Sequence, residues 1–171
     1  MKIEQTDVEA REAVHVLLLS ELQRIGSGNA VILKGGVNLS LFFGSVRYSE
    51  DMDLDGDHEF APALRSAIAG IFDSRRFSSA LQALGLRGLD SGEGVNKDTD
   101  TVFRYKFRII GRGDVRYPTK VEVSFRPRHE ADTATVESVP PVFVAGYLEP
   151  GASLQVAHYE IGRASCRGRV V

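Results

Sequence analysis

The chain has 171 residues, a net charge of −2 and 43% hydrophobic residues, which predicts one soluble globular domain with a substantial core. This charge balance excludes a strongly basic nucleic-acid-binding chain, although a local basic patch is compatible with it. No apolar run reaches membrane-spanning length, and the first residues lack a signal-peptide pattern. We therefore expect a cytoplasmic protein with no membrane partner, and the single cysteine, Cys166, excludes an internal disulfide.

The first third of the chain predicts two helices and two strands. Thr6 and Glu9 have the spacing of a helix-capping box, and apolar residues follow at helical intervals until a glycine-containing turn. A short apolar strand then leads into Gly35-Gly36. In order, the predicted elements are a helix at 6–24, a strand at 30–33, a short helix at 37–43 and a strand at 52–55.

The rest of the chain predicts further helices followed by two alternating strands. Pro62 suits the first turn of a helix, and strict alternation of apolar and polar residues marks the strands. The polar, glycine-rich segment 88–100 is expected to be a mobile loop. The predicted elements are helices at 60–72 and 77–84 and strands at 102–110 and 119–125. This order predicts an α+β domain whose mixed sheet has helices packed mainly on one side.

Carboxylates occupy every second position around the strand predicted at 52–55. Residues two apart on a strand share a face, so Asp51 and Asp53 lie opposite the apolar Met52 and Leu54. Neighbouring carboxylates repel each other, and a hard divalent cation such as Mg²⁺ or Mn²⁺ stabilises them. The alternative interpretation is a solvated strand face. Asp55 shares this face but precedes a glycine at the strand end, so we do not expect it to be a ligand.

The last predicted strand carries a third carboxylate. Val121 and Val123 belong to its buried face, so Glu122 points the other way. If this strand is a neighbour of the Asp51–Asp53 strand, the three carboxylates meet on the open face of the sheet. They could then hold two divalent ions about 4 Å apart, the arrangement used for phosphoryl or nucleotidyl transfer. The alternative interpretation of Glu122 is an ion pair with an Arg or Lys on a neighbouring strand.

Glycines and basic residues near these carboxylates suit the phosphates of a nucleotide. Gly35 and Gly36 would let backbone amides approach a triphosphate at a helix N-terminus, although a tight turn explains them equally well. Lys34 and Lys120 could hold phosphate, and an ion pair near Glu122 is the alternative for Lys120. Six basic residues could form a basic floor for RNA or triphosphate; the alternative is the solvated face of a half-buried sheet. These residues are Arg104, Lys106, Arg108, Lys120, Arg126 and Arg128.

The sequence KGGVNLSLFFGSVRYSEDMDLD, residues 34–55, resembles the signature of the AbiEii/AbiGii nucleotidyltransferase toxin family. That family belongs to the DNA polymerase β-like nucleotidyltransferase superfamily, whose pattern is a Gly-Gly or Gly-Ser pair, a DhDh element (h, hydrophobic) and a distant acidic residue between hydrophobic ones. Here Gly35-Gly36, Asp51–Leu54 and Val121–Val123 supply these three elements. The run from Arg47 to Asp53 is the family-level mark.

This resemblance implies a polymerase β-like core and a metal-dependent enzyme that moves a nucleoside monophosphate from an NTP to an acceptor hydroxyl. Asp51 and Asp53 would bind both ions, while Glu122 would bind one ion and accept the proton of the attacking hydroxyl. The resemblance also marks Arg47 and Ser49 as signature positions. We expect Arg47 to contact phosphate, and pairing with a neighbouring carboxylate is the alternative.

The same resemblance implies the toxin of a bacterial toxin–antitoxin or abortive-infection pair, with tRNA as a plausible acceptor and a cognate antitoxin as partner, whose direct binding is left open. The alternative is a non-catalytic nucleotide-binding protein or an inactive fragment. Family members continue into a helical region that carries a Lys and an Arg-Asp pair. Analysis of the products formed from labelled NTP separates the two interpretations.

The end of the chain has an unusual coding pattern. Residues Glu160 to Arg167 can be back-translated into the start of a widely used sequencing adapter. We therefore interpret 1–159 as a nucleotidyltransferase core that is incomplete at its C-terminus, and 160–171 as adapter read-through. A natural basic tail is the alternative interpretation.

Overall fold

The computed structural model describes residues 6–128 and 132–160. The helices in this part are α1 (Asp7–Arg24), α2 (Gly35–Phe42), α3 (Ala61–Asp73), α4 (Arg75–Ala83) and α5 (Pro141–Tyr147). The strands are β1 (Val31–Lys34), β2 (Met52–Gly56), β3 (Gly88–Asp98), β4 (Val102–Ile110), β5 (Arg116–Ser124), β6 (Ala134–Ser138) and β7 (Gln155–Tyr159). None of the helices in the described ranges has the length and apolar character needed to cross a bilayer.

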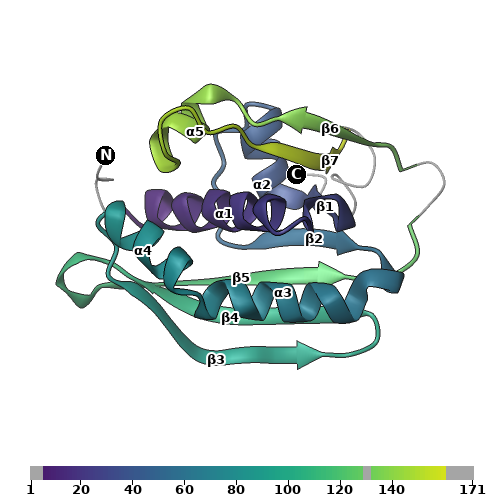
Figure 1. Cartoon of the computed structure of the whole chain (residues 1–171), viewed down its shortest axis with the longest axis horizontal. Helices are drawn as coiled ribbons and strands as arrows, with labels where there is room; N and C mark the ends of the chain where they lie inside the picture. Colours follow the sequence, from purple (N-terminus) through teal and green to yellow (C-terminus); the bar gives the residue numbers. More distant parts are fainter. Residues whose placement is uncertain (1–5, 129–131, 161–171) are drawn as a thin grey trace.

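The described strands form one mixed sheet in the order β3-β4-β5-β2-β1-β7-β6 (Figure 1). β2 pairs with β5, and β1 with β7, in parallel; the other neighbours are antiparallel. Parallel neighbours need a long crossover, and here the chain passes through α3, α4, β3 and β4 before β5 inserts beside β2. The mixed sheet predicted from the sequence is confirmed.

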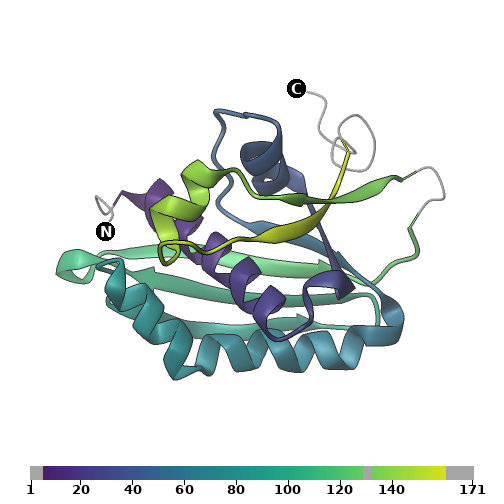
Figure 2. The same ribbon diagram turned by 45° about the horizontal axis from the view of Figure 1, so that its top comes forward.

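Helix α1 is the centre of the hydrophobic core. Thr6 caps it, because its Oγ1 accepts a hydrogen bond of 3.2 Å from the backbone N–H of Glu9. Eleven of its 18 residues are buried, since it lies between α5 and β7 on one side and α3 and α4 on the other (Figure 2). A helix surrounded in this way is apolar on most of its circumference. With α3 and α4 it covers one face of the central strands, as the sequence predicted.

The prediction of a mobile loop at 88–100 is wrong. This segment is the edge strand β3, which pairs with β4 along most of its length. The register shifts twice, between Asp90 and Gly94 and between Val95 and Lys97. Gly92 and Gly94 have φ angles of +40° and +56°, so glycine supplies the left-handed backbone at the first irregularity. The glycines and polar residues that suggested a loop therefore belong to an irregular edge strand.

Other differences lie at element ends and in the last part of the chain. α2 begins at Gly35, two residues before the predicted start, and β5 begins at Arg116 rather than at 119. The sequence patterns predict no element at β6, α5 or β7; β7 and β6 form one edge of the sheet, and α5 lies between them in the chain. Of the expected read-through tail, residues 161–171 lie outside the described part, so the structure does not test that interpretation.

The buried His15 of α1 makes the fold sensitive to acid. Burial, and to a lesser degree the charge of Arg11, lower its pKa from 6.5 to about 3. In the unfolded chain His15 therefore binds a proton near pH 6.5, whereas in the folded chain it binds one only near pH 3. The free energy of unfolding should fall across this window by as much as about 1.4 kcal/mol per pH unit from this residue.

Thermal unfolding measured from pH 7 to pH 4 checks this expectation. Nε2 of His15 lies 3.3 Å from the hydroxyl of Thr119. His15→Gln keeps a polar group that can make this contact but removes the titration, so the stability of the variant should depend less steeply on pH. Equal slopes for the wild type and the variant would contradict the assignment to His15.

Candidate active site

Four charged residues form a row across four neighbouring strands. In the register of the sheet, Lys34 of β1 faces Asp53 of β2, Asp53 faces Glu122 of β5, and Glu122 faces Arg104 of β4. Direct cross-strand partners share a face, so all four side chains lie on the same side of the sheet. The other face of β2 and β5 is fully buried through Met52, Leu54, Val121 and Val123. The sheet therefore separates a charged row from the core.

The charged row lies in a cleft of about 990 Å³. The nine residues singled out from the sequence all line it, namely Lys34, Gly35, Gly36, Arg47, Ser49, Asp51, Asp53, Lys120 and Glu122. Arg104, Arg126 and Arg128 from the predicted basic floor also line the cleft, whereas Lys106 and Arg108 are not part of its lining. The structure thus brings the candidate residues together, while their individual roles stay predictions.

Burial and a neighbouring carboxylate disfavour the ionised form of Asp53. Its pKa is raised, first by burial and then by the negative charge of Glu122. The ammonium groups of Lys34 and Lys120 act in the opposite direction but do not cancel these effects. A carboxyl group in this position gains from any further positive charge that enters the cleft.

Asp51 lies in the loop before β2 and is fixed by β5. Its Oδ1 accepts a hydrogen bond of 3.2 Å from the backbone N–H of Lys120, and its Oδ2 is 3.9 Å from the Lys120 ammonium. The loop itself is held by Ser49, which donates to the carbonyl of Asp51 at 2.6 Å, and by Thr119, which donates to the carbonyl of Glu50 at 2.5 Å. Lys120 therefore contacts Asp51, and Ser49 has a structural contact within the loop.

Glu122 is paired with a cation in this structure. The Nε of Arg104 donates to its Oε2 at 2.6 Å, which is the cross-strand ion pair considered as the alternative for this residue. Within residues 6–128 and 132–160, no group of three His, Cys, Asp or Glu side chains converges on a common metal position. The donor types nevertheless suit a hard divalent cation, because Asp53 and Glu122 are direct neighbours with Asp51 beside them. In this structure Oε2 of Glu122 is engaged by Arg104 rather than by such a cation.

The two glycines at the start of α2 are required by close contacts. Gly35 has a φ of +70°, and a Cβ added there would lie 2.9 Å from Oδ2 of Asp53. A Cβ on Gly36 would lie 2.7 Å from the Cβ of Ser49. The backbone of the first turn of α2 consequently approaches both the carboxylate row and the loop before β2. This is more than a tight turn, the alternative considered for these glycines.

Sequence reasoning missed one anchor of the row. Asp55 accepts a hydrogen bond of 2.5 Å from the hydroxyl of Tyr159 on β7, and its Oδ1 is 2.6 Å from the Lys34 ammonium. Lys34, predicted to hold phosphate, is thus paired with Asp55 in this structure. Tyr159 carried no signal, because its role depends on β7 lying beside β1, which local sequence patterns do not reveal.

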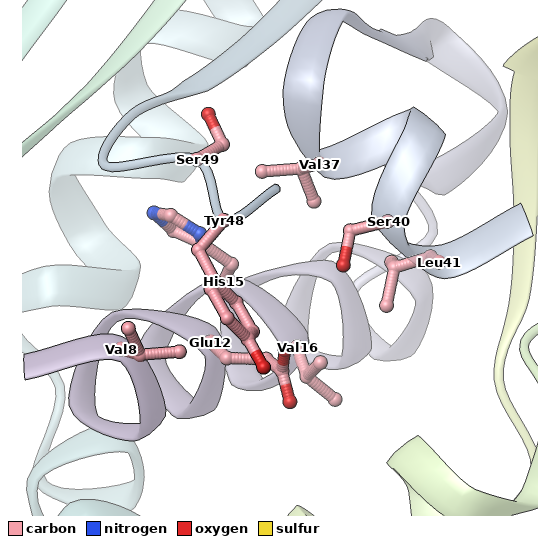
Figure 3. Close-up of a pocket in the computed structure, with 9 residues that line it drawn as sticks. All are labelled: Val8, Glu12, His15, Val16, Val37, Ser40, Leu41, Tyr48 and Ser49. Carbon is pink, nitrogen blue, oxygen red and sulfur yellow. The ribbon is translucent and has the colours of Figure 1, made fainter. Parts of the chain in front are cut away.

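A second, much smaller cavity lies behind the loop before β2, between α1 and α2. Figure 3 shows its lining, which comes from α1, α2 and the loop before β2. The lining residues are Val8, Glu12, His15, Val16, Val37, Ser40, Leu41, Tyr48 and Ser49. Its volume of about 20 Å³ holds roughly one water molecule and excludes a nucleotide. The large cleft is therefore the only one of these two cavities that can accept a nucleotide.

The family described as nucleotidyltransferase AbiEii toxin, of type IV toxin–antitoxin systems, matches residues 17–160. The chain belongs to this family. Its fold, a mixed sheet with helices packed on it, resembles that of the solved structure of JHP933 from Helicobacter pylori, which has a TM-score of 0.51 and 19% sequence identity over 94% of this chain and 54% of that one. A search of curated proteins finds no match.

Two further solved structures resemble this AbiEii-family chain more weakly. A presumed nucleotidyltransferase from H. pylori has a TM-score of 0.48 and 19% identity over 93% of this chain and 55% of that one. The nucleotidyltransferase toxin MenT4 of Mycobacterium tuberculosis has a TM-score of 0.47 and 20% identity over 72% of this chain and 40% of that one. The chain thus spans about half the length, or less, of these three solved structures.

Replacing Gly35 by alanine tests the close approach of α2 to the carboxylates. Gly44 is a matched control, because its φ is +64° but a Cβ there meets nothing within 4 Å. Both variants should lose about 1 kcal/mol of folding free energy to left-handed strain. Only Gly35→Ala should also displace Asp53 and weaken Mn²⁺ binding, measured by calorimetry. Equal Mn²⁺ affinities of the two variants would show that the contact with Asp53 does not matter for the site.

Proposed function

We propose that the protein transfers a nucleoside monophosphate from an NTP to an acceptor hydroxyl and that it uses Mg²⁺ or Mn²⁺. The observation that carries this proposal is the in-register pair of Asp53 and Glu122 in a cleft that also contains Asp51 and the Gly35-Gly36 turn. The donor set suits a divalent cation, and the glycine turn gives a triphosphate access to backbone amides. Membership of the AbiEii family supports the same reaction class.

In the proposed reaction the oxygen of the acceptor hydroxyl bonds to the α-phosphorus of the NTP. The bond between the α-phosphorus and the bridging oxygen of the β-phosphate breaks, and pyrophosphate leaves with both bonding electrons. Glu122 accepts the hydroxyl proton. Asp51, Asp53 and Glu122 would hold the divalent cation, which supplies charge stabilisation to the transferring phosphate when bound. Lys34, Lys120 and Arg47 provide positive charge to the phosphates from the walls of the cleft.

We further propose that the protein acts in the bacterial cytoplasm as the toxin of a type IV toxin–antitoxin system, opposed by a cognate antitoxin. Family membership supports the toxin role. An RNA acceptor, with tRNA as the specific candidate, is supported by the basic residues Arg126 and Arg128, which line the same cleft as the carboxylates. These groups would contact the phosphate backbone of the acceptor.

Asp53→Asn should separate stability from function. The variant removes a carboxylate whose charge is disfavoured by burial and by Glu122, so the free energy of unfolding should rise by about 1 kcal/mol, or roughly 3 °C in Tm. The same change should remove most divalent-cation binding. Calorimetry with Mn²⁺ and thermal unfolding measure the two effects. Undiminished Mn²⁺ binding in this variant would exclude Asp53 as a ligand.

Transfer of label from an α-³²P-labelled NTP to RNA tests the reaction. The gene product completed with its native C-terminal sequence should label RNA, whereas the 171-residue chain should be weak or inert. Asp51→Ala should abolish labelling, and Asp57→Ala, an exposed carboxylate just after β2, should leave it unchanged. Nucleotide binding without any transfer by the completed protein would favour the non-catalytic alternative.

A further inference from the structure

Glu122 has two different neighbours on the open face of the sheet. On one side lies Asp53 of β2, and on the other lies Arg104 of β4, both as direct register partners. The Nε of Arg104 is 2.6 Å from Oε2 of Glu122, and the two side chains are 26% and 25% exposed. Repulsion from Asp53 and attraction to Arg104 favour the same orientation of the Glu122 side chain.

This ion pair occupies the carboxylate that a divalent cation would need. In the described part of the chain, no three potential ligands converge on a metal position while Glu122 faces Arg104. A cation between Asp53 and Glu122 must therefore compete with the guanidinium for the same oxygens. In the metal-free protein Arg104 neutralises the charge of Glu122, as a cation would do in the bound state.

Releasing Arg104 leaves a guanidinium in a cleft, where it needs a new anion. Arg104 lines the same cavity as Lys34, Gly35, Gly36 and Arg47, the groups proposed to surround the triphosphate. A guanidinium presents several N–H donors in one plane, a geometry that suits phosphate oxygens. The phosphates of the nucleotide are the anions that arrive together with the cation.

We propose that Arg104 is an exchangeable counter-ion, which holds Glu122 in the metal-free protein and moves to the phosphates of the substrate when cation and nucleotide bind. This inference rests on the proposed nucleotidyl-transfer function and adds to it a positioning and substrate-binding residue. It couples the two binding events, because phosphate stabilises the released guanidinium and so favours the orientation of Glu122 that binds the cation.

The test uses Mn²⁺ and inorganic tripolyphosphate as probes, since neither depends on which base the protein accepts. Arg104→Gln should bind Mn²⁺ about threefold more tightly in the absence of phosphate, because the competing internal cation is gone. The same variant should bind tripolyphosphate, with Mg²⁺ present, about tenfold more weakly. Calorimetry measures both affinities. The opposite signs distinguish counter-ion exchange from a merely structural contact, which would weaken both.

Arg108→Gln is the matched control. Arg108 is four residues further along β4, pairs with Asp90 at 3.8 Å and does not line the cleft, so both affinities should equal those of the wild type. Arg104→Lys should restore part of the tripolyphosphate affinity. It also provides the test if Arg104→Gln does not fold, which thermal unfolding would reveal, because weaker pairing of Lys with Glu122 should still tighten Mn²⁺ binding.

Two results would overturn the proposal while leaving the proposed function intact. Weaker binding of both probes in Arg104→Gln would mean that Arg104 only supports the structure around Glu122. Unchanged binding of both probes would mean that Arg104 neither competes with the cation nor binds phosphate. A wild-type protein that binds neither Mn²⁺ nor tripolyphosphate, even with its native C-terminal sequence, would instead contradict the proposed function, and the role of Arg104 would fall with it.

Discussion

The site depends on the parallel pairing of β2 with β5. This pairing sets Asp53 directly opposite Glu122, and it fixes the side of the sheet on which both carboxylates lie. A shift of one residue in the register would send Glu122 into the core beside Met52 or Leu54, where a charge is not tolerated. The buried apolar face therefore enforces the geometry of the charged face. Neither can change without the other.

Neighbouring carboxylates make this arrangement costly, and the fold offsets the cost with cations already present. Arg104 pairs with Glu122, Lys120 contacts Asp51, and Lys34 lies beside Asp53 while pairing with Asp55. Local charge is thus nearly balanced before any ligand binds. A site built in this way trades stability against affinity, because each internal ion pair that stabilises the free protein must weaken when a cation or phosphate enters.

Much of the fold and site could be predicted because its signals are local. Alternation around Met52 and Val121 fixed the faces of β2 and β5, and the Thr6 cap marked the start of α1. Pairing between strands is not local, so the position of Tyr159 against Asp55 had no signature, and the partner of Glu122 could be named only as some Arg or Lys. β3 was missed because its glycines serve a bulged edge strand, which has the composition of a loop.

The long crossover between β2 and β5 also has a consequence for the order of events during synthesis. β5 lies between β2 and β4 in the sheet, although the ribosome makes it after both. Asp51 and Asp53 therefore leave the ribosome well before Glu122, and the carboxylates cannot meet until β5 has inserted between strands already made. Contacts this distant in sequence form slowly. A nascent chain consequently carries only two of the three carboxylates, and their full arrangement forms in one of the later steps of folding.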